Sequence, residues 1–422
     1  MEWHQLLSAE RQSSREKHPA QPARRTRSAF NRDYGRILYS SAFRRLQDKT
    51  QVFPLGRNDY VRTRMTHSLE VANVGRTLAQ RLHEIIARHG AEPLPEQESM
   101  VDIVAAVCLA HDIGNPPFGH SGEDAISAAL RGTAYEDFRF EGNAQGFRLL
   151  SRTCDPIGNH GLDLTAATLA AFTKYPCTAD SQHGIYKKFG IMPEELPTFA
   201  DVAEQCGLTP LHPAGAVWAR HPLALLMEAA DDISYLIADV EDAFFSKIIS
   251  YEECIEQLSS MDAHYDAHKH AGKKDPHAKA AHVHLARAIA VGSCIDQAAQ
   301  VLATHYGEIM SGQFTGSLMK HTPYRDRYDA VKRFSVERIY NHESVIRIEI
   351  AGFSVLKGLL EIFMQWVTSP SSSPGRKIGD ILHAPPAESE RERFLHVIDY
   401  VSGMTDSYAL QTYNTLTGHS AL

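Results

Sequence analysis

Residues 101–117 read VDIVAAVCLAHDIGNPP, and this stretch decides the fold class. Four of its residues recur at intervals of three and four, the spacing of one helix face: Val101, Val104, Cys108 and His111. Pro116-Pro117 then end the helix, because proline lacks a backbone donor and clashes with the preceding turn. Similar patterns predict helices over 71–85, 142–151, 164–173, 222–245, 285–306, 344–367 and 390–415. Few segments alternate with period two and no strand–glycine–helix unit occurs, so the sequence predicts an all-α fold.

The composition is that of an ordinary globular protein. The chain has 422 residues, 43% hydrophobic and 22% charged, enough for one large domain or two smaller ones. No apolar run approaches the roughly 20 residues of a membrane helix, so we expect no membrane partner. The first residues do not resemble a secretory leader, and six scattered cysteines without a C-x-x-C pair argue against disulfides or a zinc ribbon. We therefore expect a cytoplasmic protein.

The charge is distributed unevenly along the chain. The net charge is −8, yet residues 11–64 hold 14 Lys and Arg against 4 Asp and Glu. That basic stretch is expected to meet an anionic group: nucleotide phosphates, a nucleic acid or an acidic neighbouring subunit. The alternative is an exposed basic arm without a specific role.

Two histidines and a carboxylate are candidates for a metal site. His111 lies on the apolar face of its predicted helix and is followed by Asp112, and His67 falls on the apolar face of the preceding helix. In the helix over 228–242, an acidic stripe with Asp231 at its centre lies opposite the apolar stripe, which favours Asp231 over Asp232 as a ligand. Imidazole and carboxylate together suit a divalent metal. The alternatives are core histidines and a solvated acidic face.

The order His67, His111-Asp112, Asp231 resembles the H…HD…D signature of the HD-domain phosphohydrolases. Five longer phrases resemble the deoxyguanosine triphosphate triphosphohydrolase family: FRRLQDKTQV at 43–52, RTRMTHSLEV at 62–71, HDIGNPPFGHSGE at 111–123, EGNAQGFR at 141–148 and GMTD at 403–406. The resemblance is dense from about residue 28 to 245 and sparser to about 415.

The resemblance implies an HD-domain helical bundle with additional C-terminal helices. We expect a basic N-terminal arm over 1–27, the HD core over 28–245, and a C-terminal helical part over 246–422 packed on the core. Within that last part, the His-rich stretch 260–284 is interpreted as a polar insertion and the Ser- and Pro-rich stretch 369–375 as a flexible loop.

Enzymes of that family hydrolyse a deoxynucleoside triphosphate (dNTP) at the α-phosphorus, which gives the deoxynucleoside and tripolyphosphate. By resemblance, His67, His111, Asp112 and Asp231 hold a divalent ion, with Mn²⁺, Mg²⁺ or Fe²⁺ left open, and His120 and Glu123 form an acid/base pair. The implied substrate contacts are Arg64 at the α-phosphate, Gln51 at the sugar and base, Tyr235 at the deoxyribose, Asp239 at a sugar hydroxyl, and Asn143, Lys174 and Tyr175. Glu349 is a further candidate. Asn115 stands where many relatives have histidine.

The resemblance also implies a homo-oligomer, a tetramer or hexamer, and possible binding of single-stranded DNA through residues such as Arg24, Arg25 and Arg27. Two alternatives stay open: an HD-type phosphohydrolase or phosphodiesterase acting on another nucleotide, and a nucleic-acid-binding regulatory protein that kept the fold. The preferred dNTP, and the need for a nucleotide activator, are not fixed by these motifs.

Overall fold

The computed structural model describes residues 1–15, 27–53, 61–90, 93–154, 160–213, 215–265, 275–383 and 389–419. Within these ranges the chain is helical, and its only β-type pairings are isolated bridges such as the one between Arg11 and Thr165. The all-α prediction is therefore confirmed. In the same ranges, every helix is too short or too polar to cross a membrane.

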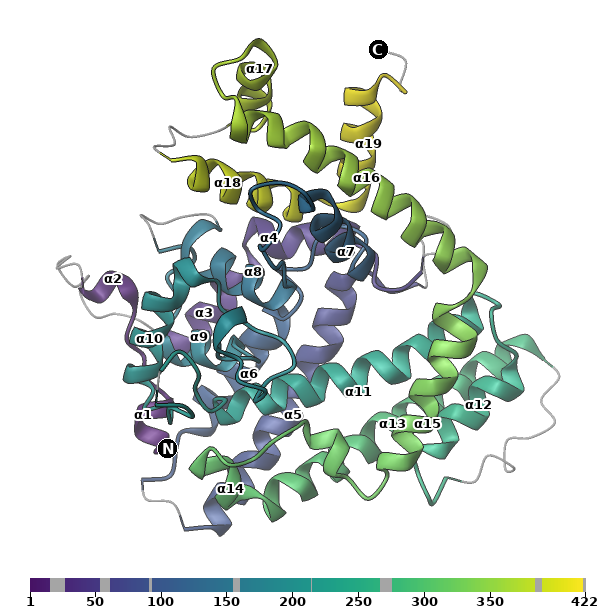
Figure 1. Cartoon of the computed structure of the whole chain (residues 1–422). Coiled ribbons are helices and arrows are strands. Elements are labelled where there is room, and N and C mark those ends of the chain that lie inside the picture. The colour runs from purple at the N-terminus through teal and green to yellow at the C-terminus, as the bar shows by residue number, and fades with distance from the viewer. Residues whose placement is uncertain are drawn as a thin grey trace.

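The main core is built around α6 (Gln97–Ala110), whose residues from Ser99 to Ala110 are all buried. It packs against α5 (Arg64–Arg88), α3 (Ala29–Leu38), α9 (Ala166–Phe172) and α11 (Pro222–Phe245), and α13 (Pro276–Thr304) lies outside α5 and α11 (Figure 1). The axes of α5 and α6 approach closely at Gly75, where a Cβ would lie 2.6 Å from Cys108 Sγ. This close approach sets the ends of the two helices side by side.

A second hydrophobic cluster forms around the long helix α16 (Glu343–Thr368). Its partners are α7 (His120–Leu130), α17 (Ser373–Ile381), α18 (Glu390–Ser402) and α19 (Asp406–Thr417), which lie together at the top of Figure 1. The first turns of α16 instead contact the main core through Val345. One continuous helix therefore joins the two clusters.

The remaining elements are short. The α-helices are α1 (Trp3–Leu6), α2 (Gln12–Arg15), α4 (Ser41–Arg45), α8 (Gly142–Arg148), α10 (Leu196–Gln205), α12 (Tyr251–Ser260), α14 (Tyr306–Ser311) and α15 (Arg325–Phe334). Single turns of 3₁₀ or π type are η1 (Leu46–Asp48), η2 (Leu149–Thr153), η3 (Ala179–Ser181), η4 (Pro193–Glu195), η6 (Leu318–His321) and η7 (Ser335–Tyr340).

Three predicted boundaries are wrong. The polar insertion 260–284 ends early, because Asp275 caps α13 and Pro276 is its first residue, a position where proline is favourable. Its His282 is buried between the hydroxyls of Tyr251 and Tyr265 at 2.5 Å each, while 266–274 lie outside the described residues.

The flexible loop 369–375 is also shorter than predicted, because Ser372 caps α17 and the helix starts at Ser373. The single helix predicted over 390–415 is two helices, because Thr405 caps a new one, α19, three residues after α18 ends. In both places a hydroxyl side chain starts a helix inside a stretch that was assigned otherwise.

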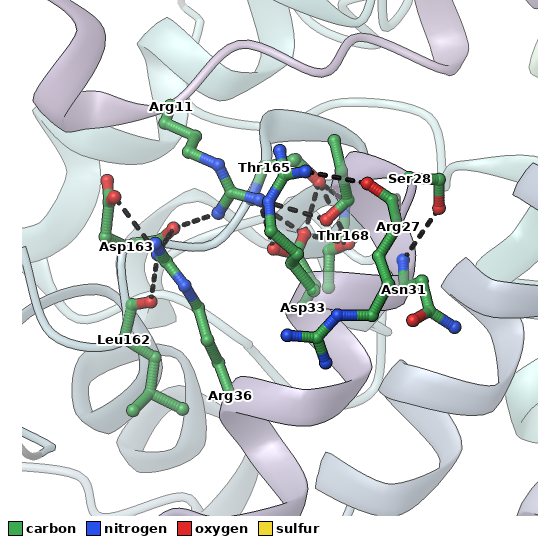
Figure 2. Close-up of polar contacts among 12 residues, drawn as sticks. Arg11, Arg27, Ser28, Asn31, Asp33, Arg36, Leu162, Asp163, Thr165 and Thr168 are labelled. Atoms are coloured by element: carbon green, nitrogen blue, oxygen red, sulfur yellow. Dashed lines mark hydrogen bonds and ion pairs between the residues drawn. The ribbon is translucent and has the colours of Figure 1, made fainter. Parts of the chain in front are cut away.

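The basic N-terminal region is largely integrated into the body of the protein. Trp3 and Leu6 are buried, so residues 1–15 are not a separate arm. Figure 2 shows Arg11 and Arg36 converging on Asp33 and Asp163: Arg11 Nη2 lies 2.7 Å from Asp33 Oδ1, and Arg36 Nη1 lies 3.0 Å from Asp163 Oδ2.

Further along the basic stretch, Arg62 pairs with Glu70, Glu241 and Asp242. Carboxylates of the same chain thus neutralise Arg11, Arg36 and Arg62, three residues of the stretch that was expected to meet an external anion. Arg24 and Arg25 lie outside the described residues.

Candidate active site

The helix ends bring the predicted metal ligands together. His67 lies in the first turn of α5, His111 and Asp112 follow α6, and Asp231 lies on α11. Candidate ligand atoms of His67, His111 and Asp112 all lie within 4.8 Å of one another. Asp231 Oδ1 lies 3.2 Å from His67 Nε2 and 3.5 Å from His111 Nε2, so it belongs to the same cluster.

The hydrogen bonds of His111 prepare it as a ligand. Its Nδ1 donates to the backbone carbonyl of Cys108 at 2.7 Å, which leaves a lone pair on Nε2. That Nε2 is buried and has no hydrogen-bond partner. A buried, unpaired imidazole nitrogen beside two carboxylates fits a divalent cation, and metal-binding histidines typically donate their other ring N–H to a carbonyl or carboxylate, as His111 does here. The residues present therefore fit a metal site.

The groups around Asp231 hold it in its ionised form. Burial by itself would raise the pKa of Asp231, but His111, His67 and Lys174 lower it well below its usual range. Lys174 Nζ lies 3.6 Å from Asp231 Oδ2. Burial instead raises the pKa of the adjacent Asp232 to about 7. The two consecutive carboxylates thus differ in their readiness to ionise. This difference agrees with the prediction that Asp231, rather than Asp232, is the metal ligand.

Asp112 is fixed by two donors besides its place in the cluster. Arg64 Nη1 donates to Asp112 Oδ2 at 2.8 Å, and Asn115 Nδ2 donates to Asp112 Oδ1. Arg64 is almost completely buried, and its guanidinium passes close to Gly119. Asn115 therefore orients the metal-site carboxylate from the outside.

His120 and Glu123 begin α7 and face one another, with Nδ1 and Oε2 3.3 Å apart. Gly119, with φ of 59°, precedes the helix, and both side chains project from its first turn. Glu123 Oε1 accepts from the backbone N–H of Gly142 at 3.0 Å, so the start of α8 sets its position. The hydrogen bond that His120 donates to the Glu123 carboxylate raises the pKa of His120. The His120 side chain is 88% exposed, within reach of a substrate.

These groups border one cavity of about 520 Å³. Eleven of the predicted site residues line it: Gln51, Arg64, His111, Asp112, His120, Glu123, Asn143, Lys174, Tyr175, Asp231 and Tyr235. His67 is buried at the cavity's edge against Tyr235, with ring centroids 6.3 Å apart. Glu349 also lines the cavity.

Asp239 is not part of the cavity wall. It is buried, and its Oδ2 accepts a hydrogen bond from the Tyr340 hydroxyl at 2.6 Å. Burial raises the pKa of Asp239 to about 7. The predicted direct contact with a sugar hydroxyl is therefore replaced in this structure by a contact with Tyr340, which does line the cavity.

Several cavity residues had no signal in the sequence. Lys188, from a loop, and Lys332, from α15, add two positive charges to the wall. Lys188 Nζ lies 3.3 Å from the Glu141 carboxylate. Both lysines lie in segments without a motif, where a lysine is usually a surface charge. Periodicity could not assign them, because tertiary folding alone brings these segments to the cavity.

Known proteins resemble the chain over its whole length. A sequence model of the HD domain matches residues 64–171, and one of the phosphohydrolase-associated domain matches residues 320–415. A deoxyguanosinetriphosphate triphosphohydrolase-like protein of Synechocystis sp. is 40% identical, with all of both chains covered. The chain belongs to this family.

Two other members of the family are likewise similar to this chain over all or nearly all of their length. The protein of that name from Pseudomonas aeruginosa is 38% identical over all of both chains. A deoxyguanosinetriphosphate triphosphohydrolase of Salmonella arizonae is 30% identical over 92% of this chain and 93% of its own. The predicted family is thus confirmed, and the chain is a hydrolase of the HD phosphohydrolase family. The family and the His-His-Asp cluster together indicate a divalent metal site.

Proposed function

We propose that the protein hydrolyses deoxynucleoside triphosphates, dGTP or a broader range of dNTPs, to the deoxynucleoside and tripolyphosphate with the help of a divalent metal. The observation that carries the proposal is that one cavity is lined both by three candidate metal ligands (His111, Asp112 and Asp231) and by four cationic side chains: Arg64, Lys174, Lys188 and Lys332. A triphosphate carries several negative charges, and such a cation set suits it.

The metal would be held by His67, His111, Asp112 and Asp231, with Mn²⁺, Mg²⁺ or Fe²⁺ as candidates. When bound, it would polarise an α-phosphate oxygen and neutralise the charge that develops there. Arg64 donates to Asp112 and lies at the cavity wall, so its remaining N–H groups are available to phosphate oxygens. Its Nε is buried without a hydrogen-bond partner.

His120 and Glu123 supply the proton transfers in this proposal. His120, protonated more readily because of Glu123, gives a proton to the departing 5′ oxygen of the sugar. Glu123, held by Gly142, orients the attacking water and accepts its proton. The elevated pKa of His120 suits an acid that must carry its proton near neutral pH.

Gln51 and Tyr235 are proposed to recognise the sugar. Gln51 lines the cavity, and its side-chain oxygen is buried without a hydrogen-bond partner. A buried acceptor of this kind is satisfied by a hydroxyl donor such as the 3′-OH of deoxyribose. Tyr235 lines the cavity beside Tyr340, with ring centroids 6.0 Å apart, and is proposed to stack against the deoxyribose, where it would disfavour an added 2′-OH. Asp239 acts indirectly, through Tyr340.

The predicted homo-oligomer, a tetramer or hexamer, and the predicted binding of single-stranded DNA are kept as proposals. Sedimentation of the full chain tests the first. The second requires a salt-dependent affinity for oligodeoxynucleotides, since phosphate contacts release counterions. The metal-site carboxylates and the acid/base pair favour an enzyme over a regulatory protein that only binds nucleic acid.

The decisive experiment incubates the purified protein with each dNTP and with GTP, in Mn²⁺ or Mg²⁺, and separates the products by anion exchange. We expect tripolyphosphate and deoxynucleoside from at least one dNTP, and none from the His111→Ala/Asp112→Ala double variant. A His305→Ala/Glu308→Ala variant controls for the loss of two side chains, because that pair lies outside the cavity. Phosphate or pyrophosphate as product would refute cleavage between the α-phosphorus and the 5′ oxygen, and activity on a cyclic or signalling nucleotide alone would favour the alternative.

A further inference from the structure

The turn between the metal ligands and the acid/base pair has an unfavourable backbone. Phe118 has φ of 62° and Gly119 has φ of 59°. Glycine adopts this region freely, but a residue with a bulky side chain does so only when its surroundings hold it there. His120 follows directly, so the conformation of this turn decides where its imidazole points.

A carboxylate of the C-terminal part holds the turn by its backbone. Asp406, the first residue of α19, is buried, and its Oδ1 accepts from the N–H of Phe118 at 3.0 Å. Its Oδ2 accepts from the N–H of Thr50 at 2.9 Å. Thr50 precedes Gln51 in the cavity wall. One side chain therefore links the loop before His120 to the loop that carries Gln51.

Helix α16 holds the same turn by its side chain. A Cβ on Gly352 would lie 2.4 Å from Phe118 Cγ, so the ring rests directly on the helix backbone at this glycine. Any larger residue at position 352 would push the ring away. Gly358, in the same helix, makes an equally close approach to a different ring, that of Tyr413 in α19, with a Cβ–Cε2 distance of 2.4 Å. Gly358 offers a matched comparison for Gly352.

A buried lysine adds a third connection between the same segments. Lys49 Nζ donates to the carbonyl of Asn115 at 2.6 Å and to that of Ser402 at 2.9 Å. Ser402 ends α18, and Asn115 lies in the loop between the metal ligands and the turn. Lys49 is only 2% exposed, so both bonds lie in the interior.

We propose that Asp406 and Gly352 are positioning residues for hydrolysis: together they hold the Phe118–Gly119 turn, and hence His120 and Glu123, in the reactive arrangement. The C-terminal part, far away in the sequence, would thus complete the active site without contributing a group that touches the reacting atoms. The kinetic consequence of this inference rests on the proposed function. The contacts of Asp406 and Gly352 with the Phe118–Gly119 turn, called the clamp below, can be tested without substrate.

The substrate-free test is hydrogen exchange by mass spectrometry on the full chain. In Asp406→Asn, one of the two acceptors becomes an amide donor, and in Gly352→Ala the added methyl displaces the ring of Phe118. We expect peptides covering residues 113–124 to exchange at least about tenfold faster in both variants, because a lost backbone hydrogen bond exposes its N–H. In Gly358→Ala these peptides should exchange as in the wild type. Unchanged exchange at 113–124 in both test variants would overturn the clamp.

The kinetic test compares the same variants at a temperature where thermal denaturation shows all of them folded. Gly352→Ala should lower kcat about 10- to 100-fold with KM within about twofold, since small misplacements of reacting groups reduce rate more than binding. Asp406→Asn should lower kcat and also raise KM, because it releases the Gln51 loop as well. Gly358→Ala should keep both constants.

Equal kcat values for Gly352→Ala and Gly358→Ala would refute the positioning role. A wild type that hydrolyses no dNTP, yet shows the expected exchange pattern in the variants, would refute the proposed function and leave the clamp standing.

Discussion

Acidification should weaken the fold through a single buried histidine, His221. This residue caps the N-terminus of α11, the helix that carries Asp231. Its Nδ1 accepts from the N–H of Leu223 at 3.1 Å, so the neutral ring carries its proton on Nε2, which donates to the Leu6 carbonyl at 2.9 Å. Burial lowers the pKa of His221 to about 4, and the hydrogen bond to Leu6 only partly opposes this.

The sign of the effect follows from proton uptake. In the unfolded chain the imidazole titrates near 6.5, whereas in the folded protein it titrates near 4. As pH falls below 6.5, His221 binds a proton in the unfolded state but stays neutral in the folded state. The free energy of unfolding therefore decreases. At about 1.4 kcal/mol per pH unit, His221 removes about 2–3 kcal/mol between pH 6.5 and pH 4.5. Near pH 7 its contribution to this pH dependence is small.

The assay is urea denaturation followed by circular dichroism at pH 7.0 and pH 4.5, for the wild type and His221→Asn. Asparagine keeps an N-cap acceptor but does not titrate. At pH 7.0 the variant should be less stable by about 1–2 kcal/mol, because the bond to Leu6 is lost. At pH 4.5 this gap should close or reverse, since all other groups titrate alike in both proteins. An equal gap at both pH values would refute the reasoning.

Three further predictions concern the site. Glu123→Gln should lower kcat about 10²- to 10⁴-fold, as expected for loss of a general base. Glu308→Gln, in another His–Glu pair three residues apart, should leave kcat unchanged; steady-state kinetics measures both. Gly142→Ala should lower kcat about 10²-fold, because the added Cβ would lie 2.3 Å from Asn115 Oδ1. The control Gly292→Ala, whose Cβ would meet no atom within 4 Å, should leave kcat unchanged in the same assay. Chelation should lower the Tm, and Mn²⁺ at 100 times its Kd should restore about 2.7 kcal/mol of stability in differential scanning calorimetry; an unchanged Tm would contradict a bound metal.

The helix faces seen in the sequence are enough to predict that His67, His111 and Asp231 lie close together. His67 and His111 share the apolar seams of α5 and α6, and burying those seams necessarily turns both rings inward. The position of Asp231 on its helix, opposite the apolar stripe, likewise indicates the direction in which its side chain points. The periodicity of a single helix is enough to predict that a side chain points inward when the side chain packs against the hydrophobic core.

The rest of the site depends on contacts that no local pattern encodes. Lys188 and Lys332 reach the cavity only because a loop and α15 fold back onto it. Asp239 was expected to contact a sugar hydroxyl, yet its carboxylate accepts a hydrogen bond from Tyr340, which lies about 100 residues further along the chain. The basic stretch shows the same limit: its arginines were expected to need an external anion, but Asp163, far along the chain, is the partner of Arg36.

Helix α16, which packs in both hydrophobic clusters, connects the cavity wall to the distant C-terminal helices. Its 26 residues correspond to about 39 Å, with Ile348 and Glu349 near one end bordering the cavity and Val367 near the other packed among the C-terminal helices. A rigid rod of this length that tilts by about 5° around its middle moves each end by roughly 2 Å. Repacking beneath Val367 would therefore widen or narrow the cavity from a distance. Residues that never line the cavity would thus alter its width.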